Sequence, residues 1–277
     1  MTRYFLVSLL LFTIGCSSKN QSENTVIDNA IDTQLQLEHP EAGNEPERAK
    51  IDLFFENGKA YYYAGIIDIY SSQIVMKLVA NGNDITGTYY YSTRQKELQL
   101  KGQINLEDQS IELEESYKGK TSGYFSGYYS ESSIKGTWKD AKNEDNSADF
   151  NLSKLSINSK TIVADKQKFK QYKLEHESGL YNSETDDYDL YTTEDKINIS
   201  YIDHATFDFY YSVNGMNGHS GSIAGLANMK TEKEGYYTDQ NGCELTFIFN
   251  KDTIEILASG CEDYSGMRAH FGGKLAK

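Results

Sequence analysis

The sequence of 277 residues is poor in proline, cysteine and positive charge. It has two prolines and three cysteines, and 27 Lys and Arg residues against 41 Asp and Glu residues give a net charge of −14. Three cysteines are too few for a disulfide-dense mini-protein. The acidic balance argues against a protein that binds nucleic acid or anionic membranes, because such binding needs a basic surface. With 38% hydrophobic residues and 22 tyrosines, a chain that is disordered throughout is also excluded.

The apolar run near the amino terminus is too short to cross a membrane. It extends from Tyr4 to Ile14, follows the positive charge of Arg3, and ends before the small residue Gly15. A membrane-spanning helix needs roughly 20 apolar residues. The run therefore predicts a secretory signal peptide over residues 1–15.

The sequence Ile14-Gly15-Cys16 resembles the lipobox of bacterial lipoproteins, in which a small residue precedes a cysteine that is lipidated before cleavage. Thr13 departs from the pattern, because leucine is usual three residues before the cysteine. The resemblance implies a palmitate-bearing Cys16, and hence a protein anchored by lipid in the bacterial cell envelope, at the periplasmic or surface face of the outer membrane. The alternative is an ordinary signal peptide followed by an incidental cysteine.

Residues 16–50 differ from the rest of the chain in composition. They are polar, carry few large apolar side chains, and contain both prolines, Pro40 and Pro46. Such a segment buries too little surface to offset its ordering entropy. We expect a flexible tether between the lipid and the folded part.

Residues 51–154 predict an all-β domain. Short runs of alternating apolar and polar residues, as in Leu98-Gln99-Leu100, are separated by turn residues, and no run has a helical period. This pattern indicates an antiparallel up-and-down barrel or a sandwich. The expected strands are 60–70, 73–79, 85–91, 98–104, 110–115, 121–129, 132–138 and 148–152.

A second β domain is expected over residues 178–277. It follows residues 155–177, which lack glycine, are rich in basic residues, and predict a linker or a short helix. Turn signals such as Asn217-Gly218 and Asn241-Gly242 separate its strands. The expected strands are 189–192, 196–202, 205–213, 220–229, 235–238, 243–249, 253–258 and 268–275.

One short motif recurs in both domains, namely an apolar residue, any residue, and then glycine. It ends at Gly87, Gly102, Gly136 and Gly225. Glycine within a strand marks a bend, a bulge or a close backbone approach. We interpret these glycines as architectural; the alternative is that they open a ligand cavity.

Cys243 and Cys261 form an even pair once Cys16 carries lipid. Outside the cytosol such a pair predicts a disulfide that closes a loop of about 18 residues. The alternative is two buried free thiols.

The last 100 residues or so resemble a small β domain of bacterial envelope proteins. The resemblance rests on Asn217-Gly218-His219-Ser220-Gly221-Ser222-Ile223-Ala224-Gly225, on Cys243 to Phe249, on Cys261, and on the closing Phe271-Gly272-Gly273. In some relatives this domain follows a cysteine-rich module like that of lysozyme inhibitors. That module is absent here, so the resemblance implies a fold and a compartment more than an activity.

Catalytic and metal-binding patterns are missing. The five histidines lack the close spacing of a zinc site, and the serines lack a nucleophile-elbow motif. The cluster Glu184, Asp186, Asp187 and Asp189 has oxygen ligands suited to calcium but lacks the glycine of a calcium loop, so a solvated loop is the default interpretation. We therefore predict no catalytic residue, no metal ligand and no cofactor.

Tyrosines occur in pairs and triplets that place aromatic rings on both faces of a strand. The ligand-binding candidates are Tyr89, Tyr91, Tyr128 and Trp138, because such rings suit sugar or protein recognition. We expect a non-catalytic envelope lipoprotein that binds a glycan or a basic protein, with inhibition of a muramidase as one version. The alternative is an envelope hydrolase that acts on glycans or peptides.

Overall fold

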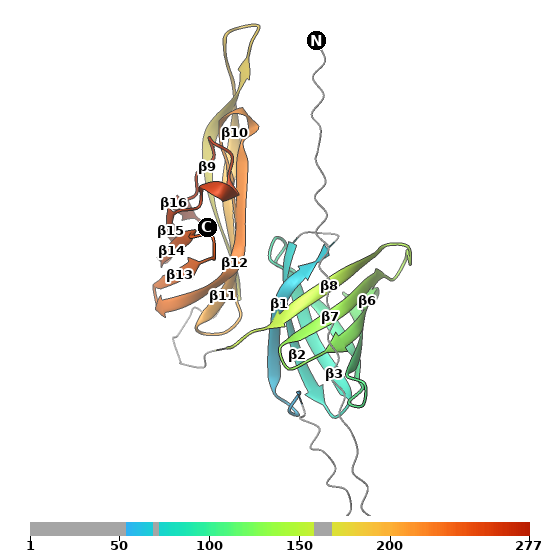
Figure 1. The fold of residues 1–277 in the computed structure, drawn as a ribbon. Coiled ribbons are helices and arrows are strands. Elements are labelled where there is room, and N and C mark those ends of the chain that lie inside the picture. The colour runs from blue at the N-terminus through green and yellow to red at the C-terminus, as the bar shows by residue number, and fades with distance from the viewer. Residues whose placement is uncertain (1–53, 69–71, 158–167) are drawn as a thin grey trace, which may run out of the picture. The chain divides into compact units, whose positions relative to one another are not determined.

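The computed structural model describes residues 54–68, 72–157 and 168–277. Within them the chain forms two closed antiparallel barrels of eight strands each (Figure 1), so the predicted all-β fold is confirmed. The predicted signal peptide, the lipidation site Cys16 and the tether lie outside the described residues. No helix in the described part of the chain is long and apolar enough to span a membrane.

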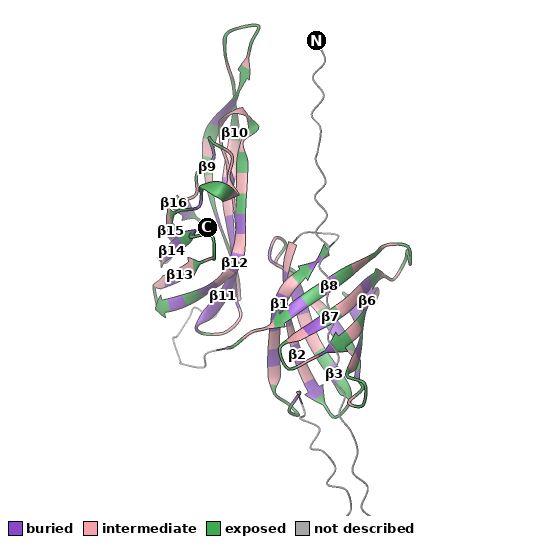
Figure 2. Cartoon of the chain, in the orientation of Figure 1, coloured by how far each residue is buried: buried purple, intermediate pink, exposed green. Residues whose placement is uncertain are grey.

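The first barrel follows the predicted strand pattern closely. Each strand pairs with the next along the chain, and the last strand pairs with the first to close the barrel. Buried and exposed residues alternate along the strands (Figure 2), as in any closed barrel, where successive side chains point into and out of it. The strands are β1 (Ala60–Ile67), β2 (Ser72–Asn81), β3 (Asp84–Tyr91), β4 (Leu98–Ile104), β5 (Ser110–Tyr117), β6 (Lys120–Tyr129), β7 (Ser133–Asp140) and β8 (Ser147–Lys154).

The second barrel closes through β9, which pairs with β10 and β16. The expected strands 189–192 and 196–202 form one continuous strand, β10, and β9 begins at Phe169, inside the segment 155–177 expected as a linker or helix. β9 and β10 project as a long hairpin (Figure 1). The elements are β9 (Phe169–Asn182), β10 (Asp187–Tyr201), β11 (Thr206–Asn214), η2 (Met216–Gly218), β12 (Ser220–Thr231), β13 (Glu234–Thr238), β14 (Glu244–Phe249), β15 (Thr253–Ser259), η3 (Glu262–Tyr264) and β16 (Gly273–Ala276).

Aromatic side chains fill one end of the first barrel. Phe55 is 4% exposed and makes edge-on ring contacts with Tyr61 and Tyr129, at centroid distances of 5.2 and 5.3 Å. Further along the axis, Phe125 packs edge-on against Tyr89 and Phe150. Edge-to-face packing adds to the stabilisation from burial. This end of the barrel is therefore packed.

Glycines allow adjacent strands to come close. A Cβ atom at Gly102 would lie 1.8 Å from the carbonyl oxygen of Glu112, and one at Gly136 would lie 2.1 Å from that of Ser126. No side chain fits in such a gap without a shift of the backbone. At these positions the structure favours the architectural interpretation of the recurring glycine motif.

Polar and apolar contacts join the outer faces of the two barrels. Tyr90 packs edge-on against Phe169 at a centroid distance of 5.2 Å. The carboxylate of Asp208, which is fully buried, accepts hydrogen bonds from Ser92 Oγ at 2.8 Å and from the side-chain amide of Gln73. Tyr90 is therefore buried although it points out of its own barrel.

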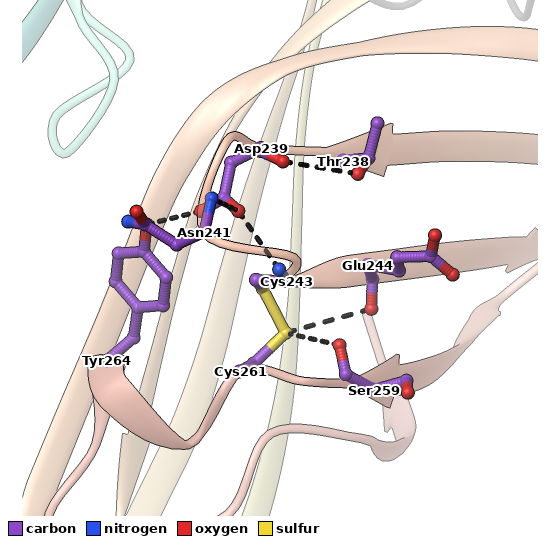
Figure 3. The surroundings of a disulfide bond; sticks show 8 residues. All are labelled: Thr238, Asp239, Asn241, Cys243, Glu244, Ser259, Cys261 and Tyr264. Atoms are coloured by element: carbon purple, nitrogen blue, oxygen red, sulfur yellow. Dashed lines mark hydrogen bonds between the residues drawn. A yellow bond between two sulfur atoms is a disulfide. The ribbon is translucent and has the colours of Figure 1, made fainter.

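The predicted disulfide between Cys243 and Cys261 is confirmed (Figure 3). Cys243 immediately precedes β14 and Cys261 follows β15, so the bond links the ends of two paired strands. Next to it, Asp239 Oδ1 accepts the backbone N–H of Cys243 at 2.9 Å. The hydrogen bond that Tyr264 donates to Asp239 lowers the pKa of this carboxyl.

Candidate functional site

A cavity of about 320 Å³ lies within the first barrel, away from the end that Phe55, Tyr61 and Tyr129 fill. The strands are antiparallel, so the carboxyl ends of β3, β5 and β7 meet the amino ends of β2, β4 and β6 at one end of the barrel. The cavity is at this end, and its volume is at the lower limit of small-ligand pockets, about 300 to 1,000 Å³. Its lining residues are Ser72, Tyr89, Tyr91, Thr93, Arg94, Leu98, Glu115, Ser122, Trp138 and Asp140.

Glu115 lies on the floor of this cavity and is 3% exposed. Its Oε2 accepts hydrogen bonds from the phenol of Tyr89 at 2.5 Å and from the indole Nε1 of Trp138 at 2.9 Å. Its Oε1 accepts a third hydrogen bond, from Ser122 Oγ at 2.5 Å. A buried carboxylate needs such donors, because its transfer from water is costly without them.

The alternation along β5 explains why Glu115 points inward. Ile111 and Leu113 are buried in the barrel while Glu112 and Glu114 are exposed, and Glu115 continues the inward series. The register between β5 and β6 shifts between Glu115 and Ser116, as at a β-bulge. Bulges redirect side chains at the rims of barrels.

Gly123 on β6 makes room for the indole of Trp138. A Cβ atom at this position would lie 2.5 Å from Trp138 Nε1. Glycine therefore allows the indole to lie across β6, where its N–H reaches Glu115. Trp138 lines the cavity and is only 4% exposed. Its indole is therefore part of the cavity floor and not of the rim.

Tyrosines of β3 line the cavity on alternate positions. The rings of Tyr89 and Tyr91 meet edge-on at a centroid distance of 5.6 Å. Burial, reinforced by the nearby Glu115 carboxylate, raises the pKa of the Tyr89 phenol far above its ordinary value. The phenol therefore stays protonated and serves as a donor to Glu115.

Polar side chains surround the opening of the cavity. Arg94 is exposed, and Asp140 is partly buried and accepts the backbone N–H of Lys142 at 2.7 Å. Ser72 Oγ and Thr93 Oγ1 lie 3.1 Å apart, within hydrogen-bonding distance. The cavity thus has an aromatic and acidic floor and a polar rim.

Three of the four predicted ligand-binding residues come together here. Tyr89, Tyr91 and Trp138 line the cavity, whereas Tyr128 is 66% exposed and is not among the lining residues. Tyr129, its neighbour on β6, is buried, so Tyr128 points out of the barrel. Sequence reasoning missed Glu115, Ser122 and Gly123; the signal was a glutamate at an inward position of an amphipathic strand.

Other polar clusters show structural hydrogen bonds. At the tip of the β9–β10 hairpin, Asn182 Nδ2 donates to Asp189 Oδ2 at 3.0 Å. His176 Nε2 lies 3.2 Å from Asp195 Oδ1, while Ser178 Oγ donates to the carbonyl oxygen of Gly215. Across the described residues, no group of three or more His, Cys, Asp or Glu side chains is placed to hold a metal ion.

Comparisons with family models, curated proteins and solved structures find no match to this chain.

Proposed function

We propose that this chain is a non-catalytic binding protein of the bacterial cell envelope whose ligand enters the cavity of the first barrel. A pocket with aromatic walls and a few convergent polar groups is typical of small-ligand sites. Glu115, Ser122 and Asp140 come from strands, which hold side chains more accurately than loops do. The sequence Ile14-Gly15-Cys16 supports the location.

The Glu115 network carries this proposal. An apolar residue at position 115 would continue the inward series of Ile111 and Leu113 without burying a carboxylate. The chain instead places a carboxylate there, surrounds it with three donors, and leaves an open cavity beside it. Departures from simple core packing of this kind are expected at functional sites.

Trp138 provides a direct test, because it is the only tryptophan in the sequence. The chain without its signal peptide would be titrated with monosaccharides, glycan fragments, amines and amino acids, while tryptophan emission and heat of binding are recorded. The proposal expects at least one compound that binds and changes the emission. It would be overturned if every compound that binds by calorimetry left the emission unchanged.

A matched pair of variants locates the binding site. Tyr91→Ala removes a ring from the cavity, and Tyr128→Ala removes an exposed ring from β6 outside it. We expect weaker binding only for Tyr91→Ala. Equal losses in both variants would contradict binding in the cavity.

Glycoside hydrolysis is the second candidate function, because the carboxylates of Glu115 and Asp140 line the same cavity. Such chemistry uses one carboxyl group as the acid and another as the base or nucleophile. Both oxygens of Glu115 accept hydrogen bonds from neighbouring side chains, which favours a fixed acceptor over a proton donor. Release of reducing sugar from a glycan, lost in Glu115→Gln, would favour hydrolysis over binding alone.

A further inference from the structure

The lining of the cavity carries an excess of negative charge. Its acidic side chains are Glu115 and Asp140, and its one basic side chain is Arg94. The lining therefore has two acidic side chains and one basic side chain. The more deeply placed of these groups is Glu115, at 3% exposure, whereas Arg94 is exposed.

The partners of Glu115 supply hydrogen bonds but no positive charge. Tyr89, Ser122 and Trp138 are all neutral donors. None of the ion pairs among the described residues includes Glu115 or Arg94. A buried carboxylate is stabilised by a nearby cation, so the cavity floor favours a ligand that brings one.

The remaining geometry also suits a cation. An ionised carboxylate has about four acceptor sites, and three neighbouring donors leave capacity for another. The faces of Tyr and Trp rings attract ammonium groups, and the attraction grows when water is excluded. Tyr89, Tyr91 and Trp138 supply such rings within one cavity beside the carboxylate.

We propose that the ligand of the first barrel is a compact organic ammonium compound whose cationic group lies on the floor beside Glu115. This inference rests on the proposed function, because it names the class of ligand bound in the same cavity. The carboxylate of Glu115 would repel an anionic group, and a neutral sugar would leave the charge of that carboxylate uncompensated. Arg94 at the rim favours a neutral or anionic group at the other end of the ligand.

The test compares choline with its neutral isostere, in which a tert-butyl group replaces the trimethylammonium group. Ethanolamine, betaine and N-acetylglucosamine complete the set, and binding is followed by calorimetry and Trp138 emission. We expect at least one ammonium compound to bind about tenfold more tightly than the neutral isostere, from the range of cation–π energies and the added charge of Glu115. Equal binding of the isostere and all ammonium compounds would overturn the inference.

Failure of the inference differs from failure of the proposed function. Binding of N-acetylglucosamine with a change in Trp138 emission, and no preference for ammonium compounds, would overturn the ligand class but leave the binding function in place. Compounds that bind without any change in Trp138 emission would overturn both.

Charge-neutralising variants test the role of each group. Glu115→Gln and Asp140→Asn should weaken binding of the preferred ammonium probe, and Arg94→Gln should leave it unchanged or tighten it. Glu112→Gln is the matched control, because Glu112 lies on the same strand but is exposed outside the barrel. Circular dichroism and thermal unfolding show whether Glu115→Gln still folds. Asp140→Asn tests the same charge effect at a partly buried position, independently of the fold of Glu115→Gln. Binding that is unaffected in both Glu115→Gln and Asp140→Asn would contradict the proposal.

Discussion

The indole Nε1–H of Trp138 donates a hydrogen bond to Glu115 Oε2 at 2.9 Å. The two residues are on β7 and β5, which are not neighbours in the barrel, so this bond crosses the space over β6. It is possible because Gly123 on β6 has no side chain to block the indole. The only tryptophan of the protein is thereby fixed against the only buried carboxylate in the lining of the cavity.

Tyr89→Phe should destabilise the first barrel by about 1.5 to 3 kcal/mol, the usual contribution of a hydrogen bond to a charged group. The substitution removes one of the three donors to Glu115 and leaves the ring in place. Tyr128→Phe is the control, because its ring is exposed, and it should change stability by less than about 0.5 kcal/mol. Urea unfolding measures both variants. Equal effects would contradict the assigned role of Tyr89.

Gly123→Ala should displace the indole of Trp138 from the cavity floor. The new Cβ would lie 2.5 Å from Nε1, and overpacking of this kind costs about 1 to 3 kcal/mol. We expect a shift in tryptophan emission and weaker ligand binding. Ser126→Ala, on the exposed face of β6, is the control. An emission spectrum of Gly123→Ala identical to that of wild type would contradict the close approach of the indole to Gly123.

The strands of the first barrel could be predicted from the sequence, because alternation and turn residues are both local. Its eight predicted runs correspond one by one to β1–β8. β9 was not predicted because Lys173 separates its inward side chains Tyr172 and Leu174, and the residues on either side of this short stretch are polar, which gives a weak apolar pattern. β10 is exposed at residues 189–192 and buried near Ile197. This change of pattern made its sequence resemble two separate strands.

The cavity itself could be predicted only in part. Residue type alone identified Tyr89, Tyr91 and Trp138. Tyr128 was placed in the same group because the sequence does not show which residues of β6 point into the barrel. Glu115 was not predicted because the alternating pattern of β5 ends in two consecutive glutamates, which is typical of a strand end exposed to solvent. The bulge at Glu115 and the closure of the barrel depend on pairing between strands.

Removal of the disulfide should destabilise the second barrel. Cys243 and Cys261 are 18 residues apart in sequence, and closure of such a loop contributes about 3 kcal/mol in the chain-entropy model. The double variant Cys243→Ser/Cys261→Ser should unfold at lower temperature than wild type, and reductant should lower the wild-type transition but not that of the variant. A melting temperature unaffected by reductant or substitution would contradict a stabilising role for the bond.

Asp208 should make stability depend on pH. Burial raises the pKa of its carboxyl to about 7 in the folded protein, while hydrogen bonds from Ser92 and Gln73 act in the opposite direction. In the unfolded chain the pKa is about 3.9. The folded state therefore binds more protons between these values, and stability contributed by this group falls as pH rises from about 4 to about 7.

Urea unfolding of wild type and Asp208→Asn at about pH 5 and about pH 8 measures this effect. The wild type should lose more stability than the variant between the two conditions. A difference between the two proteins that is independent of pH would contradict the raised pKa.

Cys16→Ala should release the protein from the membrane fraction of the cells that produce it. The predicted lipid is attached at this cysteine, and the net charge of −14 disfavours binding of the chain itself to an anionic membrane. Cell fractionation followed by immunodetection measures the change, with Ser18→Ala as a control for a substitution near the proposed lipidation site. Retention of Cys16→Ala in the membrane fraction would contradict the lipid anchor.

The most direct test of the ligand site is fluorine NMR of protein labelled with fluorotryptophan. Because the sequence contains a single tryptophan, the folded protein should give one resonance, from the cavity floor. We expect a bound ammonium compound to shift this resonance in wild type and in Glu112→Gln, but not at the same concentration in Glu115→Gln. A resonance that stays in place while calorimetry shows the compound fully bound would contradict a ligand site beside Glu115.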